Sequence, residues 1–320
     1  MTKELVKGKT IIVTGGTGSI GSEIVKQLLD TEAGQIRIYS RDEHKQHELQ
    51  QILGGDDRLR FLIGDIRDKD RMDFAFHNVD ICFHTAALKH VPFCEYNPFE
   101  AIKTNIVGTQ NVIDLALKHN LEKVIAISTD KAVNPTSVLG TSKLMMEKLI
   151  TAANFLIGDK RTRFASVRFG NVLSSRGSVL PIWLKQIERN EPITITDKRA
   201  TRFFMEIPEA VDLVFSAMEI MQGGEIFVLK MKRKFKITDF AKQTLKKHAP
   251  EKKISLKFIG LRPGEKLHEE LLTKDEADFA LETKGMFVIL PQHAPPGEIL
   301  RPRKYANARK ASVQAYRSNQ

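Results

Sequence analysis

Thr14-Gly15-Gly16-Thr17-Gly18-Ser19-Ile20-Gly21 follows a short apolar run at residues 10–14 and precedes an amphipathic helix pattern at residues 18–30. Glycines at this spacing permit a tight turn, close approach of the backbone to a pyrophosphate, and close packing of a helix on a strand. The first turn of the helix also offers unpaired N–H groups to an anion. This setting favours a dinucleotide-binding loop over a turn without a ligand. We assign to the cofactor Gly15, Thr17, Gly18, Ser19, Ile20 and Gly21.

The rest of the first half alternates short β-rich runs with longer helical patterns, as a parallel sheet with crossover helices requires. Strands are predicted at residues 10–14, 35–39, 60–63, 81–84, 123–128 and 163–169. Helices are predicted at residues 18–30, 42–53, 68–77, 97–120 and 136–155. The predicted class is α/β, a Rossmann-type doubly wound parallel sheet with a smaller C-terminal substrate-binding domain.

The pattern becomes irregular after Phe169, with shorter strands separated by Pro and Gly. We therefore predict an NADP-binding domain at residues 1–170 and a mainly substrate-binding domain at residues 171–291. Parts of residues 205–232 are expected to pack back on the first domain. Residues 292–320 are rich in Pro, Arg, Lys and Ala and are predicted to form a basic tail or arm, extended or disordered.

Composition limits the possible partners. The 320-residue chain carries a net charge of +11, which favours anionic ligands such as nucleotides. Its basic clusters have few interleaved aromatics, so we predict no nucleic-acid binding. No apolar run is long enough for a signal peptide or membrane span, and Cys82 and Cys94 form no disulfide framework. We expect a cytoplasmic protein with no membrane association, and the histidines show no metal-ligand spacing.

The end of the second predicted strand bears on the choice of cofactor. An acidic residue there would hold a ribose 2′-hydroxyl, whereas Ser40 and Arg41 suit a 2′-phosphate. This favours NADP over NAD, although Arg41 could be a surface arginine. Asp65 is placed to reach the adenine, and Ala86 and Ala87 would form a floor of small residues.

The fifth predicted strand delivers Ser128, Thr129, Asp130 and Lys131 to the carboxyl edge of the sheet. Eight residues after Lys131, a Tyr-x-x-x-Lys pair is expected, but the chain has Leu139 and Lys143. These two share a helix face, and Lys143 would hold the nicotinamide ribose. Without the tyrosine, the proton chemistry falls on Asp130 and Lys131, although a strand-end salt bridge is the simpler explanation of that pair.

These residues resemble the extended short-chain dehydrogenase/reductases, and within them the 4,6-dehydratases that act on UDP-N-acetylglucosamine and invert C5. The resemblance covers nearly the whole chain. It rests on TGGTGSIGSEI (14–24), YSRDEHKQ (39–46), AALKHVPFCEYNPFEAIKTNIVGTQNV (86–112), STDKAVNP (128–135), RFGNVLSSRGSV (168–179), TDKRATRFF (196–204) and LRPGEKLHEELL (261–272).

The resemblance implies oxidation at C4, proton removal at C5, loss of the C6 hydroxyl as water and hydride return to C6. Lys131 is then the base, which requires its pKa to fall well below the usual value, and Asp130 is the acid. Leu139 provides no phenol, so Asp130, Thr129 or a water must take the C4 hydroxyl proton. A UDP-sugar 4-epimerase and a non-catalytic NADP-binding protein are the alternatives.

The resemblance also supplies a substrate groove. It implies that Asn171, Arg202 and Arg262 hold the pyrophosphate and that Glu265 holds the uridine ribose. Residues predicted to flank the uracil are Arg176, Val179 and Thr194. Ile66 and Asn105 are assigned to the cofactor, and Lys89 to both cofactor and sugar, although a surface lysine is nearly as plausible. The resembled enzymes form homo-oligomers, so a dimer to hexamer is expected.

Overall fold

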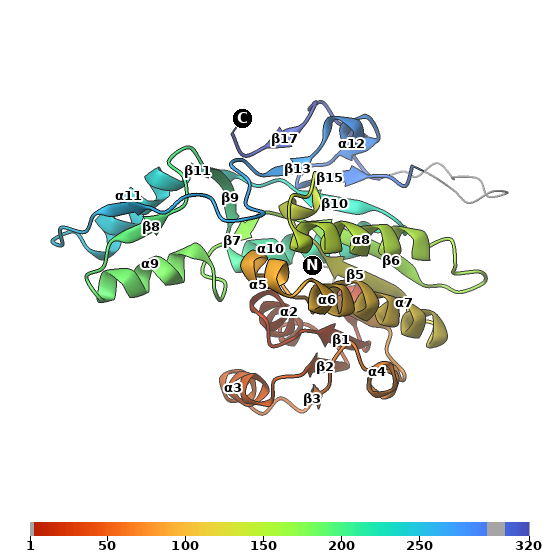
Figure 1. The fold of residues 1–320 in the computed structure, drawn as a ribbon. Coiled ribbons are helices and arrows are strands. Elements are labelled where there is room, and N and C mark those ends of the chain that lie inside the picture. The colour runs from red at the N-terminus through yellow and green to blue at the C-terminus, as the bar shows by residue number, and fades with distance from the viewer. Residues whose placement is uncertain (1–2, 293–304, 320) are drawn as a thin grey trace.

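The computed structural model describes residues 3–292 and 305–319, and its centre is a ten-stranded sheet in the order β16-β14-β15-β10-β6-β5-β4-β1-β2-β3 (Figure 1). The parallel strands are β1 (Thr10–Thr14), β2 (Gln35–Ser40), β3 (Leu59–Ile63), β4 (Ile81–His84), β5 (Lys123–Ile127), β6 (Arg163–Arg168) and β10 (Ile226–Leu229). The sheet therefore reverses direction of growth between β1 and β4, which is where a doubly wound fold binds its ligand. The predicted fold class is confirmed.

Helices cover both faces of this sheet. The relevant helices are α2 (Ser19–Leu29), α3 (Glu43–Leu53), α4 (Lys69–Phe76), α7 (Gly108–Lys118), α8 (Val138–Ala153) and α10 (Ile207–Ile220). One apolar cluster includes residues of α2 and α10, whereas a second includes residues of α4, α7 and α8. The inner strands are buried on both sides, which explains their continuous apolar sequences.

A smaller region stands beside the carboxyl edge of the sheet (Figure 1). It contains β7 (Asn171–Val172), α9 (Val179–Glu188), β8 (Ile193–Ile195), β9 (Thr201–Met205), β11 (Arg233–Lys236), α11 (Ile237–His248) and β12 (Leu256–Phe258). Its core includes Trp183, Phe204 and Phe240, with the Trp183 indole donating to the Thr194 carbonyl at 2.9 Å. The chain passes between this region and the main sheet after β6, after β9, after β10 and before β13 (Glu270–Leu272).

Several segments beyond residue 170 belong to the main sheet. α10 and β10 pack there, and so do β14 (Ala280–Glu282) and β15 (Met286–Ile289), which the sequence assigned to the second domain. The boundary at residue 170 therefore does not separate two continuous blocks of chain. The apolar side chains of these segments explain why they join the main sheet. β15 is buried throughout, and β10 pairs with it.

The C-terminal segment differs from the predicted free arm. Residues 293–304 of that prediction lie outside the described residues, but β16 (Arg309–Lys310) pairs with β14 and β17 (Tyr316–Arg317) pairs with β13. The Tyr316 hydroxyl bonds the backbone of Met231, and Tyr305 donates to Glu225 at 2.5 Å. Aromatic burial and strand pairing thus outweigh the basic composition that suggested an arm.

The predicted helix at residues 97–120 is interrupted. It consists of α6 (Pro98–Ala101), a π-helical segment at Ile102–Val107, and α7, and it follows the short α5 (Val91–Tyr96). The wide turn brings Asn105 inward, where its amide bonds both backbone groups of Leu88. π-helical turns inside longer helices are often found beside functional sites.

An ion network centred on the fully buried Arg168 joins the elements around the cavity. Arg168 on β6 donates to Glu147 on α8 at 2.6 Å and to Glu276 on α12 (Lys274–Asp278) at 3.0 Å. The same guanidinium donates to the Leu271 carbonyl on β13, and Ser128 donates to Glu147 at 2.5 Å. One side chain therefore fixes β5, β6, α8 and β13 relative to one another.

We expect Arg168→Met to lower the free energy of unfolding by about 3–5 kcal/mol, because it leaves a buried carboxylate without its partner. Arg233→Met is the control, since that arginine is half exposed and pairs with Glu206 at the surface, and it should cost under about 1 kcal/mol. Urea unfolding of both variants checks this, and equal losses would contradict it.

Candidate active site

One cavity of about 880 Å³ lies at the carboxyl edge of β1, β4, β5 and β6 and extends to the smaller region. It contains nearly all of the predicted site residues. Those lining it are Gly15, Thr17, Gly18, Ser19, Ile20, Gly21, Ser40, Arg41, Asp65, Ile66, Ala86, Ala87, Lys89, Thr129, Lys131, Lys143, Asn171, Arg176, Val179, Thr194, Arg202, Arg262 and Glu265. Asp130 and Asn105 are buried behind the wall instead.

The cofactor loop has the geometry that its glycines predict. Gly15 has φ +69°, and a Cβ there would lie 2.7 Å from the backbone of Ala86. A Cβ on Gly21 would lie 2.5 Å from the Gly15 carbonyl oxygen, so the first turn of α2 packs directly on the loop. The open N-terminus of α2 faces the cavity and can hold a pyrophosphate.

At the predicted adenosine end of the cavity, Ser40 is hydrogen-bonded within the protein, whereas Arg41 is exposed. The Ser40 hydroxyl accepts from Gln46 at 3.1 Å and from Thr17 at 3.2 Å, so it is already engaged within the protein. The Arg41 guanidinium is 59% exposed and lies 3.6 Å from Asp65. Lys45, on the first turn of α3, also lines the cavity. Two partly exposed cations, each beside a carboxylate, therefore lie at this edge.

Asp65 is held by a neighbouring arginine rather than left free for adenine. Arg67 forms a two-point contact with its carboxylate at 2.7 and 3.0 Å. Burial raises the pKa of Asp65, but the hydrogen bonds from Arg67 and the charge of Arg41 lower it by more, so the net pKa is lowered. The carboxylate therefore stays ionised beside Arg41.

The helix α8 presents the unusual pair, Leu139 and Lys143, to the cavity. Leu139 is 3% exposed and packs with Cys94 and Ala101. The Lys143 amine donates to the Ile127 carbonyl at 2.8 Å, and burial lowers its pKa to about 8 although Glu147 opposes the shift. At the position of the expected tyrosine the wall is thus apolar.

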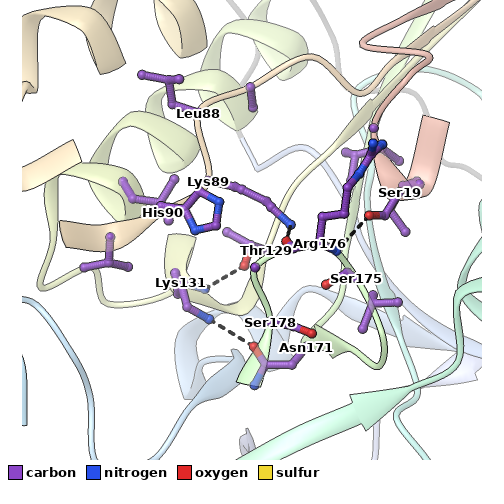
Figure 2. A pocket seen from close by; sticks show the side chains of 18 of the residues that line it. Ser19, Leu88, Lys89, His90, Thr129, Lys131, Asn171, Ser175, Arg176 and Ser178 are labelled. Carbon is purple, nitrogen blue, oxygen red and sulfur yellow. Dashed lines mark hydrogen bonds between the residues drawn. The ribbon is translucent and has the colours of Figure 1, made fainter. Parts of the chain in front are cut away.

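Lys131 and its neighbours form the charged centre of the site. Its Nζ lies 2.9 Å from Asp130 Oδ1 and 3.4 Å from Asn171 Oδ1, and Figure 2 shows the side chain directed toward Asn171. Thr129 donates to the same Asp130 oxygen at 3.0 Å. Asp130 itself has no exposed surface, and its Oδ2 faces Gly170 and has no hydrogen-bond partner in the part of the chain that the structure describes. Thr129 and Lys131, but not Asp130, reach the cavity.

The protonation of Lys131 differs from the prediction. Burial lowers its pKa, but the carboxylates of Asp130 and Glu269 raise it by more, so the net pKa lies above the usual value. The expected fall is therefore wrong for the protein without ligands. The physical reason is that two carboxylates, rather than one, face this amine.

Glu269 is a site residue that sequence reasoning missed. It lines the cavity, and its Oε1 lies 3.5 Å from Lys131 Nζ and 3.8 Å from Arg202 Nε. The signal was available, because Glu269 falls in the segment LRPGEKLHEELL that also contains Arg262 and Glu265. Nothing in that segment alone indicated which of its carboxylates turns toward Lys131.

The predicted substrate groove is partly occupied by internal contacts. Arg202 is 6% exposed and donates to Glu265 at 2.9 Å and to three backbone carbonyls, whereas Arg262 is half exposed. Thr194 bonds Gln186. Arg262 is therefore the more available cation.

Arg176 lies against the cofactor loop rather than apart from it. Its backbone N–H donates to Ser19 Oγ at 3.1 Å, its guanidinium donates to the Thr17 carbonyl, and Lys89 donates to its carbonyl at 2.5 Å (Figure 2). Arg176, predicted to contact the uracil, therefore lies where the cofactor loop meets the predicted substrate groove.

The sheet order, the glycine loop and the lysine on α8 define an extended short-chain dehydrogenase/reductase. The chain belongs to the family described as polysaccharide biosynthesis protein, which it matches over residues 11–291. Both findings confirm the resemblance inferred from the sequence.

Three relatives and one solved structure illustrate the match. An uncharacterized membrane protein of Methanocaldococcus jannaschii is 50% identical over 89% of this chain and 86% of that protein. A UDP-N-acetylglucosamine 4,6-dehydratase (inverting) of Campylobacter jejuni is 46% identical, covering 90% of this chain and 84% of its own. A UDP-glucose 4-epimerase of Rickettsia felis is 41% identical, covering 88% and 82%. The structure of Pen from Bacillus thuringiensis is 44% identical with a TM-score of 0.91, covering 98% and 93%.

Two further findings concern only residues 3–292 and 305–319. No helix there is both long enough and apolar enough to cross a membrane. No group of three or more His, Cys, Asp or Glu side chains within the same residues could hold a metal ion.

Lys143 should make stability depend on pH in the absence of cofactor. Because its folded pKa is about 8 and its unfolded value is near 10.5, the unfolded chain binds more protons between these values. As pH rises from 8 to 10, the free energy of unfolding of the native protein should therefore rise. The rise should exceed that of Lys143→Met by about 2–3 kcal/mol. Denaturant unfolding across this range measures the difference. Lys148→Met, an exposed position on the same helix, should retain the rise.

Proposed function

We propose that the chain is an NADP-dependent nucleotide-sugar 4,6-dehydratase that acts on UDP-N-acetylglucosamine and inverts C5. The observation that carries this proposal is the pairing of an amine, Lys131, with an apolar wall at Leu139, between a dinucleotide loop and an arginine-lined groove. An amine base suits removal of a carbon-bound proton, whereas a simple ketoreductase would need a phenol at position 139. The 46% identical relative named for this activity supports the assignment.

The first step is oxidation at C4. The glycine loop and Lys143 would hold NADP, which would supply the hydride acceptor for C4 and the hydride for C6. Thr129 faces the cavity and donates to Asp130, so it can pass the C4 hydroxyl proton to that buried carboxylate as the C4 ketone forms. In this route Asp130 accepts the proton through Thr129, because Asp130 is fully buried and does not reach the cavity.

The second step is elimination across C5 and C6. The C4 ketone acidifies the C5 proton, Lys131 takes it, and the C6 hydroxyl leaves as water with the proton that Asp130 received, passed back through Thr129. Hydride addition at C6 and protonation at C5 by solvent from the opposite face then give the 4-keto-6-deoxy sugar, while Lys131 returns its proton to solvent. The product is lighter than the substrate by one water, with no net redox change. Lys131 must lose a proton before it can act, since its ammonium form is stabilised in the free protein.

Two observations support NADP. Arg41 is largely exposed at the end of β2, and Lys45 lines the same edge, so both can turn to a 2′-phosphate. Their present partners, Asp65 and Asp42, are carboxylates that a phosphate would replace. NAD remains the weaker candidate.

A UDP-sugar 4-epimerase is the second candidate, favoured by the relatives that carry this name. Leu139 argues against it, because epimerisation through a C4 ketone relies on the missing tyrosine. A non-catalytic NADP-binding protein is disfavoured by Lys131 and Thr129 in the cavity. Cytoplasmic location and a homo-oligomer of two to six chains remain predictions.

Incubation with UDP-N-acetylglucosamine in heavy water tests the reaction. We expect a product lighter by one water that carries deuterium at C5, detected by mass spectrometry and NMR. An isobaric product would establish an epimerase instead, and unchanged substrate would contradict both enzymes.

Lys131→Ala should reduce turnover by about 10²–10⁴-fold, because it removes the base. Lys69→Ala is the matched control, since that lysine pairs with Asp114 on the surface and should keep normal turnover. Steady-state rates of both variants decide the assignment, and normal turnover in Lys131→Ala would remove it.

Arg41→Ala should weaken NADP binding by about tenfold or more, the equivalent of one charge-assisted contact, and leave NAD binding nearly unchanged. Calorimetric titration with both dinucleotides measures this. Equal loss for the two ligands would show that Arg41 does not read the 2′-phosphate.

A further inference from the structure

We propose that Glu269 is a positioning residue that holds the Lys131 amine at the cavity wall and controls when it is charged. This inference rests on the proposed function for its catalytic meaning, but its geometry stands alone. Glu269 immediately precedes β13 and is far from Lys131 in sequence. The two side chains meet only in the folded chain.

The contacts around Lys131 define an enclosed cluster of charges. Asp130 approaches its Nζ from behind the wall at 2.9 Å, and Glu269 approaches from the cavity side at 3.5 Å. The cations facing the cluster are Arg202, at 3.8 Å from Glu269, and Lys266. An amine between two carboxylates is held in place, and each carboxylate favours its charged form.

The second carboxylate oxygen of Glu269 can accept a further hydrogen bond. This Oε2 is buried and has no hydrogen-bond partner among the described residues, although buried polar atoms normally find one. The side chain is only 2% exposed, so water cannot satisfy this atom freely. An unpartnered acceptor beside a base is suited to a proton or to a substrate hydroxyl.

The backbone of Glu269 is fixed on both sides. Its N–H donates to Ser318 Oγ at 2.9 Å, and Ser318 N–H donates to its carbonyl at 2.9 Å. The next residue, Glu270, turns away and bonds Asn134 and Arg317. The carboxylate therefore keeps its place against Lys131 without relying on that ion pair.

Glu269→Gln tests the proposal without any substrate, because only the neutral amine reacts with acetic anhydride. Removal of one facing carboxylate should lower the Lys131 pKa, because that charge stabilises the ammonium form, and acetylation at pH 9 should become faster by roughly tenfold. Peptide mass spectrometry gives the rate at Lys131 relative to the exposed Lys232. Glu270→Gln is the matched control and should leave the rate unchanged.

Two labelling outcomes would overturn the proposal. One is an unchanged Lys131 rate in Glu269→Gln, and the other is an equal rise in Glu270→Gln, which would show general loosening of β13. Thermal unfolding of both variants identifies any loss of folding.

Activity supplies the second readout. Glu269→Gln should move the acidic limb of the kcat/KM profile to lower pH and reduce kcat more than it changes KM, and Glu269→Asp should recover part of kcat. An unchanged acidic limb of the kcat/KM profile would limit Glu269 to a structural role and overturn the proposal. If the native chain releases no dehydrated product, the proposed function fails while the labelling result still decides the role of Glu269.

Discussion

The buried guanidinium of Arg168 is the interaction on which the rest of the site depends. It joins β6 to α8 through Glu147 and to the segment after β13 through Glu276, and Ser128 shares the Glu147 carboxylate. Charges this deep are stable only when all partners are present. Lys143 on α8, Lys131 after β5 and Glu269 before β13 are thereby fixed relative to one another, although they come from distant parts of the chain.

The electrostatic arrangement matches a dianionic diphosphate ligand. The cationic groups along the cavity include Lys89, Arg176 and Arg262, and a diphosphate would meet their positive charge. Carboxylates also line the cavity, Asp65 beside Arg41 and Glu269 beside Lys131. Lys131 is therefore no free cation, because Asp130 and Glu269 both face its amine.

Local patterns predicted the fold and most of the cavity wall, since a glycine loop, buried strands and strand ends are set by neighbouring residues. Lys131 lines the cavity as predicted, because it lies in the short 3-10 turn at Asp130–Ala132 just beyond the carboxyl end of β5. The direction of Asp130 was not predictable, because a one-residue difference after a strand decides whether a side chain faces the cavity or the core. Glu269 and the docking of Tyr316 depend on tertiary packing, and the π-helical segment depends on the amide of Asn105.

The repeated passage of the chain between the main sheet and the smaller region has an evolutionary consequence. β10 and α10 lie in the main sheet, yet β9 before them and β11 after them build the smaller region. No single cut within the described residues would release the smaller region as one continuous piece. Its exchange between proteins by recombination would therefore need several crossovers at once.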